Sequence, residues 1–263
     1  MEHDHGDIWP EKLVHQMAEL GLFGATIGRE YGGLGLPATT YVKIIAYISS
    51  YWMAITGIVN SHLIMAASVE QKAKWLPSFA TGEIRGGLAL TEPNAGTDLQ
   101  AIRTVARREG DEYVINGTKT WISNGIKGSC FALLVKTDPK ADPRYKGMSL
   151  MIAPKGEGFK VGKKFDKLGY KAIDSAELVF ENYRIPAENL IGGVEGNGFY
   201  QSTGGLELGR INVAARGVGL AEGALRLATE YAQLRETMGR PIADHQAIQL
   251  KLGFAGAGQT DSA

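Results

Sequence analysis

The sequence predicts an α+β protein with several domains, in which helical regions flank a middle β domain. The spacing of apolar residues is helical up to about residue 85, changes to short β-rich runs between turn signals, and returns to helical after Pro186. The 263 residues are 44% hydrophobic, so the chain can bury a substantial core. We expect an N-terminal helical domain over 1–85, a middle β-barrel or sandwich over 86–195, and the start of a C-terminal helical bundle over 196–252.

The N-terminal region is predicted to be helical. Leu13, Met17 and Leu20 recur at helical spacing after Pro10, which suits the first position of a helix, and Gly21 ends the run. Further helices are expected in three places: 39–56, 61–69 and from Val69 onward.

The middle region carries short runs of β-branched and aromatic residues between turn signals. Asn116-Gly117 separates two such runs, and because this dipeptide favours a type I′ turn, we predict a β-hairpin centred on it. Four further strands are expected: 129–136, 147–153, 159–165 and 176–184. Several short strands at near-regular spacing are typical of a small barrel or sandwich.

One long helix is predicted from Leu206 to Thr237. It contains four interior glycines, each of which costs about 1 kcal/mol relative to alanine: Gly209, Gly217, Gly219 and Gly223. Such residues favour the close approach of another backbone or a ligand. A second helix begins after His245, but residues 253–263 lack an apolar period, so we predict that it ends at Leu252 and that an aberrant, disordered tail follows.

Composition and charge exclude several functions. The chain has 28 basic and 28 acidic residues, which argues against a dedicated nucleic-acid binder. Its one cysteine, Cys130, excludes an internal disulfide framework and a thiolate-rich metal site. The histidines near the N-terminus lack zinc-site spacing, and no phosphate-binding loop or nucleophile elbow is present. Gly33-Leu34-Gly35 has no strand before it and no βαβ unit around it, so we interpret it as a loop between helices rather than a dinucleotide fingerprint.

The sequence also predicts a cytoplasmic location. Residues 1–12 lack the basic start and apolar run of a signal peptide. The most apolar stretch, 44–59, is shorter than the roughly 20 residues that a bilayer requires, so we interpret it as a buried helix.

Three motifs indicate a family. Residues 90–98 read LTEPNAGTD, WISNG begins at Trp121, and RETMGRPIADHQ occupies 235–246. In this order and spacing they closely resemble the acyl-CoA dehydrogenase family of flavoproteins, and the resemblance runs from about residue 7 to Leu252. It implies the α, then β, then α architecture predicted above and FAD as the cofactor.

The resemblance places the cofactor site on these motifs. The family's cofactor positions are here Leu90, Thr91, Gly96, Thr97, Trp121 and Ser123, and, from the neighbouring subunit, Arg235, Thr237, Met238 and Gln246. An isoalloxazine ring needs an apolar wall, which Trp121 can supply, and donors at its edge, which Thr91 and Ser123 can supply. Gly96 and Thr97 suit a phosphate or the thioester ligand, and Arg235 suits the pyrophosphate. Each residue also has a purely structural interpretation. Trp121 could be a core aromatic of the β domain, Thr91 and Ser123 ordinary strand hydroxyls, and Arg235 a cation that interacts with the end of a helix.

The resemblance also implies a reaction, in which an acyl-CoA thioester loses its α-proton to a carboxylate base and a β-hydride to flavin and becomes trans-2-enoyl-CoA. Arg210 matches the family's substrate-binding arginine, with a solvated helix arginine as the alternative, and Thr97 would also contact the substrate. The base needs a dry pocket. Most members carry it beyond the last residue of this chain, and others at the position of Gly209. Glu207 lies about 200° away around the helix, which makes it a weak substitute.

We expect electrons to pass to an electron-transfer flavoprotein and, in a complete protein, a homotetramer built as a dimer of dimers. Because the family pattern stops at Leu252, we hypothesise a truncation or reading-frame change there, with a naturally shortened member as the alternative. Activity of the chain would then be impaired. Two other interpretations stay open: a catalytically inactive relative that binds flavin or CoA thioesters, and an acyl-CoA oxidase or flavin monooxygenase relative.

Overall fold

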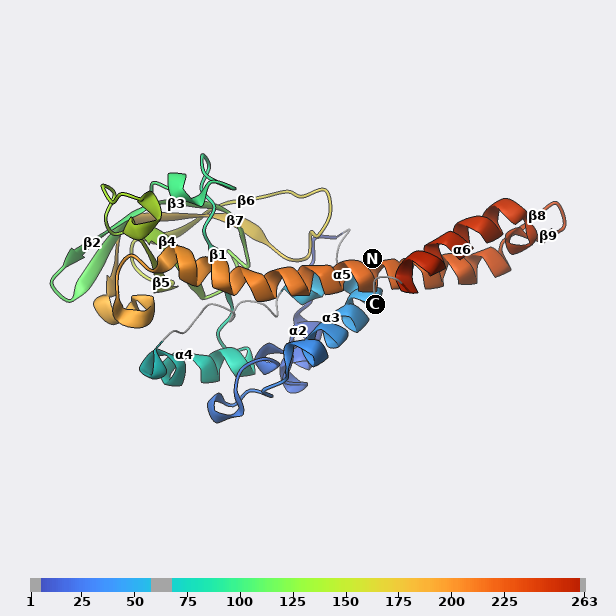
Figure 1. Ribbon diagram of the computed structural model, residues 1–263, viewed down its shortest axis with the longest axis horizontal. Coiled ribbons are helices and arrows are strands. Elements are labelled where there is room, and N and C mark those ends of the chain that lie inside the picture. Colours follow the sequence, from blue (N-terminus) through green and yellow to red (C-terminus); the bar gives the residue numbers. More distant parts are fainter. Residues whose placement is uncertain (1–5, 58–67, 261–263) are drawn as a thin grey trace. The chain divides into compact units, whose positions relative to one another are not determined.

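The computed structural model describes residues 6–57 and 68–260. The chain divides into two compact units, one made of Met1–Pro37 with Gly57–Gly209 and the other of Ala38–Thr56 with Arg210–Ala263. The long helix α5 (Gly198–Leu234) contributes to both units. Figure 1 labels the helices and strands of both.

The first unit begins with short helices. Helix α2 spans Glu11–Glu19 as the apolar spacing predicts, although Pro10 is its N-cap rather than its first helical residue. Helix α4 spans Val69–Thr81 and begins with a capping box, in which the Ser68 hydroxyl accepts from the Gln71 backbone N–H at 3.2 Å. The helix predicted over 61–69 lies largely outside the described residues, which resume at 68.

A curled seven-stranded sheet follows in the same unit (Figure 1). Its strands are β1 (Gly86–Ala89), β2 (Val105–Glu109), β3 (Glu112–Ser123), β4 (Cys130–Lys136), β5 (Met148–Pro154), β6 (Phe159–Lys164) and β7 (Ser175–Pro186). The strand order is β1-β4-β2-β3-β7-β6, and β5 also pairs with β4. Strand β4 is parallel to β1 and β2, and the other pairs are antiparallel. The four strands predicted over 129–184 are thereby confirmed.

Strand β4 shows that the sheet is buried on both faces. Successive side chains of a strand point to opposite faces, so alternate residues of β4 join two different hydrophobic clusters. One cluster contains Phe131, Leu133 and Val135, and the other contains Cys130, Ala132 and Leu134. The core of this unit therefore lies on both sides of the central strands.

The hairpin predicted at Asn116-Gly117 is wrong. Strand β3 runs without interruption from Glu112 to Ser123, and the turn that joins it to β2 is Gly110-Asp111. Gly117 lies instead at an irregularity of the pairing with β7, with φ 151°, and a Cβ there would lie 2.4 Å from Thr104 Oγ1. Gly117 therefore allows a β-bulge and the close approach of Thr104. The prediction failed because a glycine in a bulge cannot be distinguished in the sequence from a glycine in a turn.

The second unit is built around helices. It contains α3 (Ala38–Trp52), the part of α5 from Arg210, the two-stranded pair β8 (Glu236–Thr237) and β9 (Arg240–Pro241), and α6 (Gln246–Thr260). A Cβ at Gly219 or Gly223 of α5 would lie 2.0 Å from a carbonyl oxygen of α3, that of Ala46 or Ser50 respectively. The predicted close approach of a backbone is confirmed at these two glycines. At Gly209 and Gly217, nothing in the described part of the chain lies within 4 Å of a Cβ.

Helix α6 extends to Thr260, so the predicted helix end at Leu252 and the disorder of residues 253–260 are wrong. Alanine is a strong helix former, and adding a residue to an existing helix costs far less than nucleating a new one, so Ala255 and Ala257 carry the helix across the glycines. Residues 261–263 lie outside the described ranges. In those ranges, no helix has the length and apolar character needed to cross a membrane.

Candidate functional site

Two of the three motifs meet where strands β1 and β3 end. The backbone N–H of Thr120 donates a 2.8 Å hydrogen bond to the carbonyl oxygen of Thr91. Thr91 follows the buried Leu90, and Trp121 follows Thr120. The structure therefore brings the predicted site residues Leu90, Thr91 and Trp121 together.

The chain turns sharply after Thr91. The backbone of Glu92 exchanges two hydrogen bonds with that of Ala95, at 2.8 and 3.1 Å. This turn leaves Gly96 and Thr97 exposed, and a Cβ at Gly96 would meet no atom of the described chain within 4 Å. The predicted ligand contacts at Gly96 and Thr97 thus face open space.

Trp121 is not a core aromatic. Its side chain is 56% exposed, and its φ of 60° lies in the left-handed region, which is a strained conformation for a bulky residue. One face of the indole stacks on Phe165, with ring centroids 4.0 Å apart and planes 20° apart. Phe165, the residue directly after strand β6, was not among the predicted site residues.

Ser123 and its neighbour Asn124 differ in environment. Ser123 is exposed and pairs in register with Ser175 of β7. Asn124 is 2% exposed and lies in the left-handed region, and its side-chain N–H donates to the carbonyl of Gly86 at 2.9 Å. Asn124 Oδ1 is buried and has no hydrogen-bond partner in the described part of the chain.

A buried ion pair lies at the turn formed by Glu92–Ala95, called the Thr91 turn below, and neither of its members is a site residue predicted from the sequence. Lys119 Nζ lies 2.9 Å from Glu92 Oε1, and the side chains are 0% and 7% exposed. Burial lowers the pKa of Lys119 to about 8, against the opposing effect of the Glu92 carboxylate. Burial alone would raise the pKa of Glu92, but the Lys119 charge and hydrogen bonds from neighbouring residues outweigh it and hold that pKa below its ordinary value.

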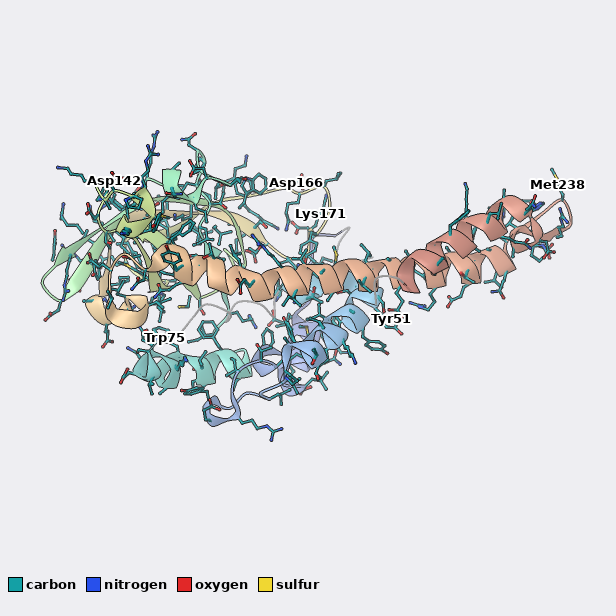
Figure 2. All side chains as sticks on the ribbon, viewed as in Figure 1. Tyr51, Trp75, Asp142, Asp166, Lys171 and Met238 are labelled. Atoms are coloured by element: carbon teal, nitrogen blue, oxygen red, sulfur yellow. The ribbon has the colours of Figure 1, made fainter. Side chains whose placement is uncertain are left out.

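The third motif forms a small hairpin in the second unit. Met238 and Gly239, both with positive φ, make the two-residue turn between β8 and β9, and Figure 2 shows Met238 at this turn. The predicted residues Arg235, Thr237, Met238 and Gln246 are all exposed. Thr237 Oγ1 lies 3.0 Å from His245 Nε2, which ties the hairpin to the start of α6.

The predicted substrate residues lie on helix α5. Arg210 and Glu207 are both exposed. Among the residues that the structure describes, Glu207 therefore has no dry pocket of the kind that a catalytic base requires. Gly209 has open space at its Cβ position among the described residues, so its backbone would accept a larger side chain.

Sequence models of three domains match the chain in order. The N-terminal domain of acyl-CoA dehydrogenase matches residues 1–83, the middle domain 87–183 and the C-terminal domain 196–257. The chain belongs to the acyl-CoA dehydrogenase family. The α, then β, then α fold class predicted from the sequence is confirmed.

Individual acyl-CoA dehydrogenase relatives agree. The (2S)-methylsuccinyl-CoA dehydrogenase of Cereibacter sphaeroides is 35% identical over 96% of this chain and 50% of its own length. The solved butyryl-CoA dehydrogenase of Megasphaera elsdenii has a TM-score of 0.92 at 33% identity, covering 99% of this chain and 70% of that one. A structure reported for the electron transferring flavoprotein of Acidaminococcus fermentans contains a chain with a TM-score of 0.93 at 36% identity, with coverage of 99% and 70%. The chain spans 50% to 66% of the length of the curated relatives.

FAD is the cofactor of the acyl-CoA dehydrogenases, and the residues present fit it. Trp121 offers an exposed aromatic face beside the Thr91 turn. The hydroxyls of Thr91, Thr97 and Ser123 have no hydrogen-bond partner among the residues that the structure describes, so they are available to a ligand. The free hydroxyls can donate hydrogen bonds to the polar edge of a flavin ring, and the aromatic side chain can pack against its face.

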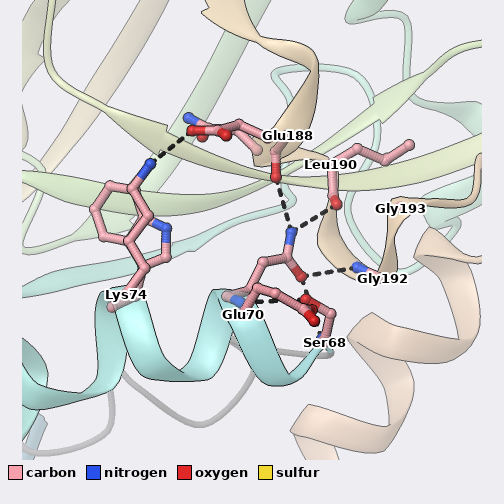
Figure 3. A pocket seen from close by; sticks show the side chains of 10 residues that line it. Ser68, Glu70, Lys74, Glu188, Leu190, Gly192 and Gly193 are labelled. Atoms are coloured by element: carbon pink, nitrogen blue, oxygen red, sulfur yellow. Dashed lines mark hydrogen bonds and ion pairs between the residues drawn. The ribbon is translucent and has the colours of Figure 1, made fainter.

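A separate pocket lies between α4 and the segment after β7 (Figure 3). Its volume is about 310 Å³, and its lining includes none of the predicted site residues. Gln71 crosses it, donating to the carbonyls of Glu188 at 3.0 Å and Leu190 at 2.7 Å. Lys74 pairs with Glu188 at 2.7 Å at its edge. These contacts join α4 to the segment that follows β7.

Proposed function

We propose that the protein catalyses the FAD-dependent α,β-dehydrogenation of an acyl-CoA thioester to trans-2-enoyl-CoA. The observation that carries the proposal is the backbone hydrogen bond from Thr120 to Thr91. It places the half-buried Thr91 beside the exposed Trp121, which follows Thr120 in the chain. Membership of the acyl-CoA dehydrogenase family supports this assignment.

The residues of the first unit have distinct roles in this proposal. FAD, when bound, accepts the hydride equivalent that leaves the β-carbon of the substrate. Trp121 supplies the apolar wall, and the free hydroxyls of Thr91 and Ser123 donate hydrogen bonds to the polar edge of the ring. The exposed Gly96 and Thr97 contact the thioester or a phosphate.

The residues of the second unit complete the proposed site of a neighbouring subunit. Arg235 provides a cation for charge-assisted hydrogen bonds to the pyrophosphate, and Thr237, Met238 and Gln246 flank the rest of the dinucleotide. Arg210 binds the CoA arm. The proposal therefore requires a homo-oligomer, with a dimer of dimers as the expected state.

The electron acceptor in this proposal is an electron-transfer flavoprotein. The likeness to a chain in a structure reported for such a flavoprotein supports the pairing. The cytoplasmic location predicted from the sequence stays a prediction.

We propose in addition that these 263 residues turn over poorly by themselves. The family reaction needs a carboxylate to take the α-proton. Gly209 carries no side chain where some members carry that glutamate, and Glu207 is exposed. Substrate binding and flavin binding are expected to persist, because their residues are present.

An anaerobic titration tests the proposal. The chain is reconstituted with FAD, and butyryl-CoA or octanoyl-CoA is added while the flavin absorption band is recorded. We expect a yellow protein whose band shifts when the thioester binds and bleaches slowly, with trans-2-enoyl-CoA detected by mass spectrometry as the product.

The other outcomes identify the alternatives. A yellow protein that never bleaches and yields no enoyl product would favour an inactive binding relative. Rapid recolouring on admission of air would indicate an oxidase or monooxygenase. A chain that stays colourless with excess FAD would contradict the proposal, and fast bleaching would contradict the proposed impairment.

A further inference from the structure

Two consecutive residues of β3 hold three consecutive residues at the end of β1. Lys119 Nζ donates to the carbonyl oxygen of Leu90 and to the carboxylate of Glu92, each at 2.9 Å. The next residue, Thr120, donates its backbone N–H to the carbonyl of Thr91 at 2.8 Å. The ammonium group of Lys119 therefore binds on both sides of Thr91.

The sheet itself does not supply this connection. Strand β4 and strand β2 separate β1 from β3 in the strand order, so no β-ladder joins β1 to β3. The carboxylate of Glu92 also accepts the backbone N–H groups of Arg103 at 2.6 Å and Thr104 at 2.9 Å, just before β2. One ion pair thus fixes the Thr91 turn to two other segments.

The pair is costly in the interior. Lys119 is 0% exposed and Glu92 is 7% exposed, and both charges lose their hydration. Replacing a buried ion pair with apolar residues of similar volume is often neutral or stabilising, so a buried pair is weak evidence for a role in stability. What this pair does supply is position, because its hydrogen bonds have fixed directions.

We propose that Lys119, together with Glu92, is a positioning residue of the cofactor site, which holds the Thr91 hydroxyl beside Trp121 in the place from which it contacts FAD. The inference rests on the proposed function, since it requires that Thr91 and Trp121 bind flavin. It assigns a role to residues that touch neither flavin nor substrate themselves.

Three variants test the inference. Lys119→Met keeps the length of the side chain and removes its charge and donors. The double variant Lys119→Met/Glu92→Gln also avoids leaving an unpaired buried carboxylate. The matched control is Lys160→Met/Glu181→Gln, which removes an exposed lysine–glutamate pair from β6 and β7 of the same sheet.

Two measurements are made on each variant at pH 7. The first is the dissociation constant of FAD together with the absorption and fluorescence of the bound flavin. The second is hydrogen exchange of the Thr120 amide in the absence of FAD. We expect about tenfold weaker FAD binding, a flavin spectrum closer to that of free FAD, and about tenfold faster Thr120 exchange in both Lys119 variants. The control should match the wild type.

The inference would be overturned if the Lys119 variants keep the FAD affinity, the flavin spectrum and the Thr120 exchange of the wild type. The proposed function would then still stand. A wild-type chain that binds no FAD would overturn the proposed function and this inference with it. If neither Lys119 variant folds, the pair is required for the fold itself, and the positioning role is contradicted.

Discussion

The indole ring of Trp121 stacks on the phenyl ring of Phe165, with their centroids 4.0 Å apart. Trp121 remains 56% exposed, so Phe165 covers part of the ring and leaves the rest to solvent. The stack supports a side chain whose own backbone is strained at φ 60°. Phe165 therefore holds the aromatic wall of the proposed flavin site.

Phe165→Ala is expected to weaken FAD binding. An aromatic pair contributes about 1 kcal/mol beyond burial of area, and its loss frees the indole to change rotamer. The measurements are the FAD dissociation constant and the fluorescence of Trp121, the latter taken as the difference from a Trp121→Phe variant. Phe254→Ala, which removes a 76% exposed phenylalanine from α6, is the control. Equal FAD affinity in Phe165→Ala and the control would show that the stack does not support the site.

Gly223→Ala is expected to destabilise the second unit. The added Cβ would lie 2.0 Å from the carbonyl oxygen of Ser50, so α3 and α5 must separate. We expect a loss of about 2 kcal/mol or more in the free energy of unfolding, as for overpacked cores. The control is Gly217→Ala in the same helix, where a Cβ would meet no described atom within 4 Å, and where alanine should stabilise by up to about 1 kcal/mol. Urea unfolding measures both changes, and two changes of the same sign would refute the packing argument.

The burial of Lys119 should make the free energy of unfolding depend on pH in the alkaline range. Burial lowers the pKa of Lys119 from the ordinary 10.5 to about 8 in the folded protein. Between these values the unfolded chain holds a proton that the folded chain has released, so this group makes stability rise with pH. We expect the wild type to gain stability relative to Lys119→Met as the pH rises from about 8 to 10.5. A difference that stays constant or falls would contradict the burial of the ammonium group.

Subunit exchange should restore FAD binding between two defective variants. Trp121→Ala damages the part of the proposed site in the first unit, and Arg235→Ala damages the part that the neighbouring subunit supplies. A mixture forms some dimers in which one site receives both intact parts. We expect each variant alone to bind FAD weakly and the mixture to recover part of the binding, measured by flavin fluorescence. No recovery after demonstrated subunit exchange would contradict a shared site.

Local sequence patterns predicted the fold well where one periodicity extends over many residues. Strand β4 is a continuous apolar run, so its position follows from the sequence. Helix α5 has a sustained helical period, although it spans Gly198–Leu234 rather than the predicted Leu206 to Thr237. Short signals were ambiguous. Asn116-Gly117 indicates a turn as readily as the bulge that it forms, and the small residues of α6 after Leu252 indicate a coil as readily as the observed helix.

Only the site residues that lie within the family motifs could be predicted from the sequence. Resemblance identified Thr91 and Trp121, and the fold joins them through Thr120. Their supports could not be predicted, because a lysine or glutamate in a sequence is usually on the surface. The burial of Lys119 and Glu92 depends on contacts between three segments, after β1, before β2 and within β3, which local sequence patterns do not bring together. Phe165 likewise contacts Trp121 only through the tertiary fold.

Anaerobic bleaching of the flavin in Gly209→Glu shows whether the missing proton acceptor limits the reaction. We propose that the described chain holds an acyl-CoA dehydrogenase site without a proton acceptor at the position of Gly209, where a Cβ would meet no described atom within 4 Å. Gly217→Glu, at another open glycine of α5, is the control. On addition of butyryl-CoA or octanoyl-CoA, we predict that Gly209→Glu bleaches markedly faster than the wild type and the control and releases trans-2-enoyl-CoA. A Gly209→Glu variant that holds FAD, binds the thioester and bleaches no faster than the wild type would contradict the account.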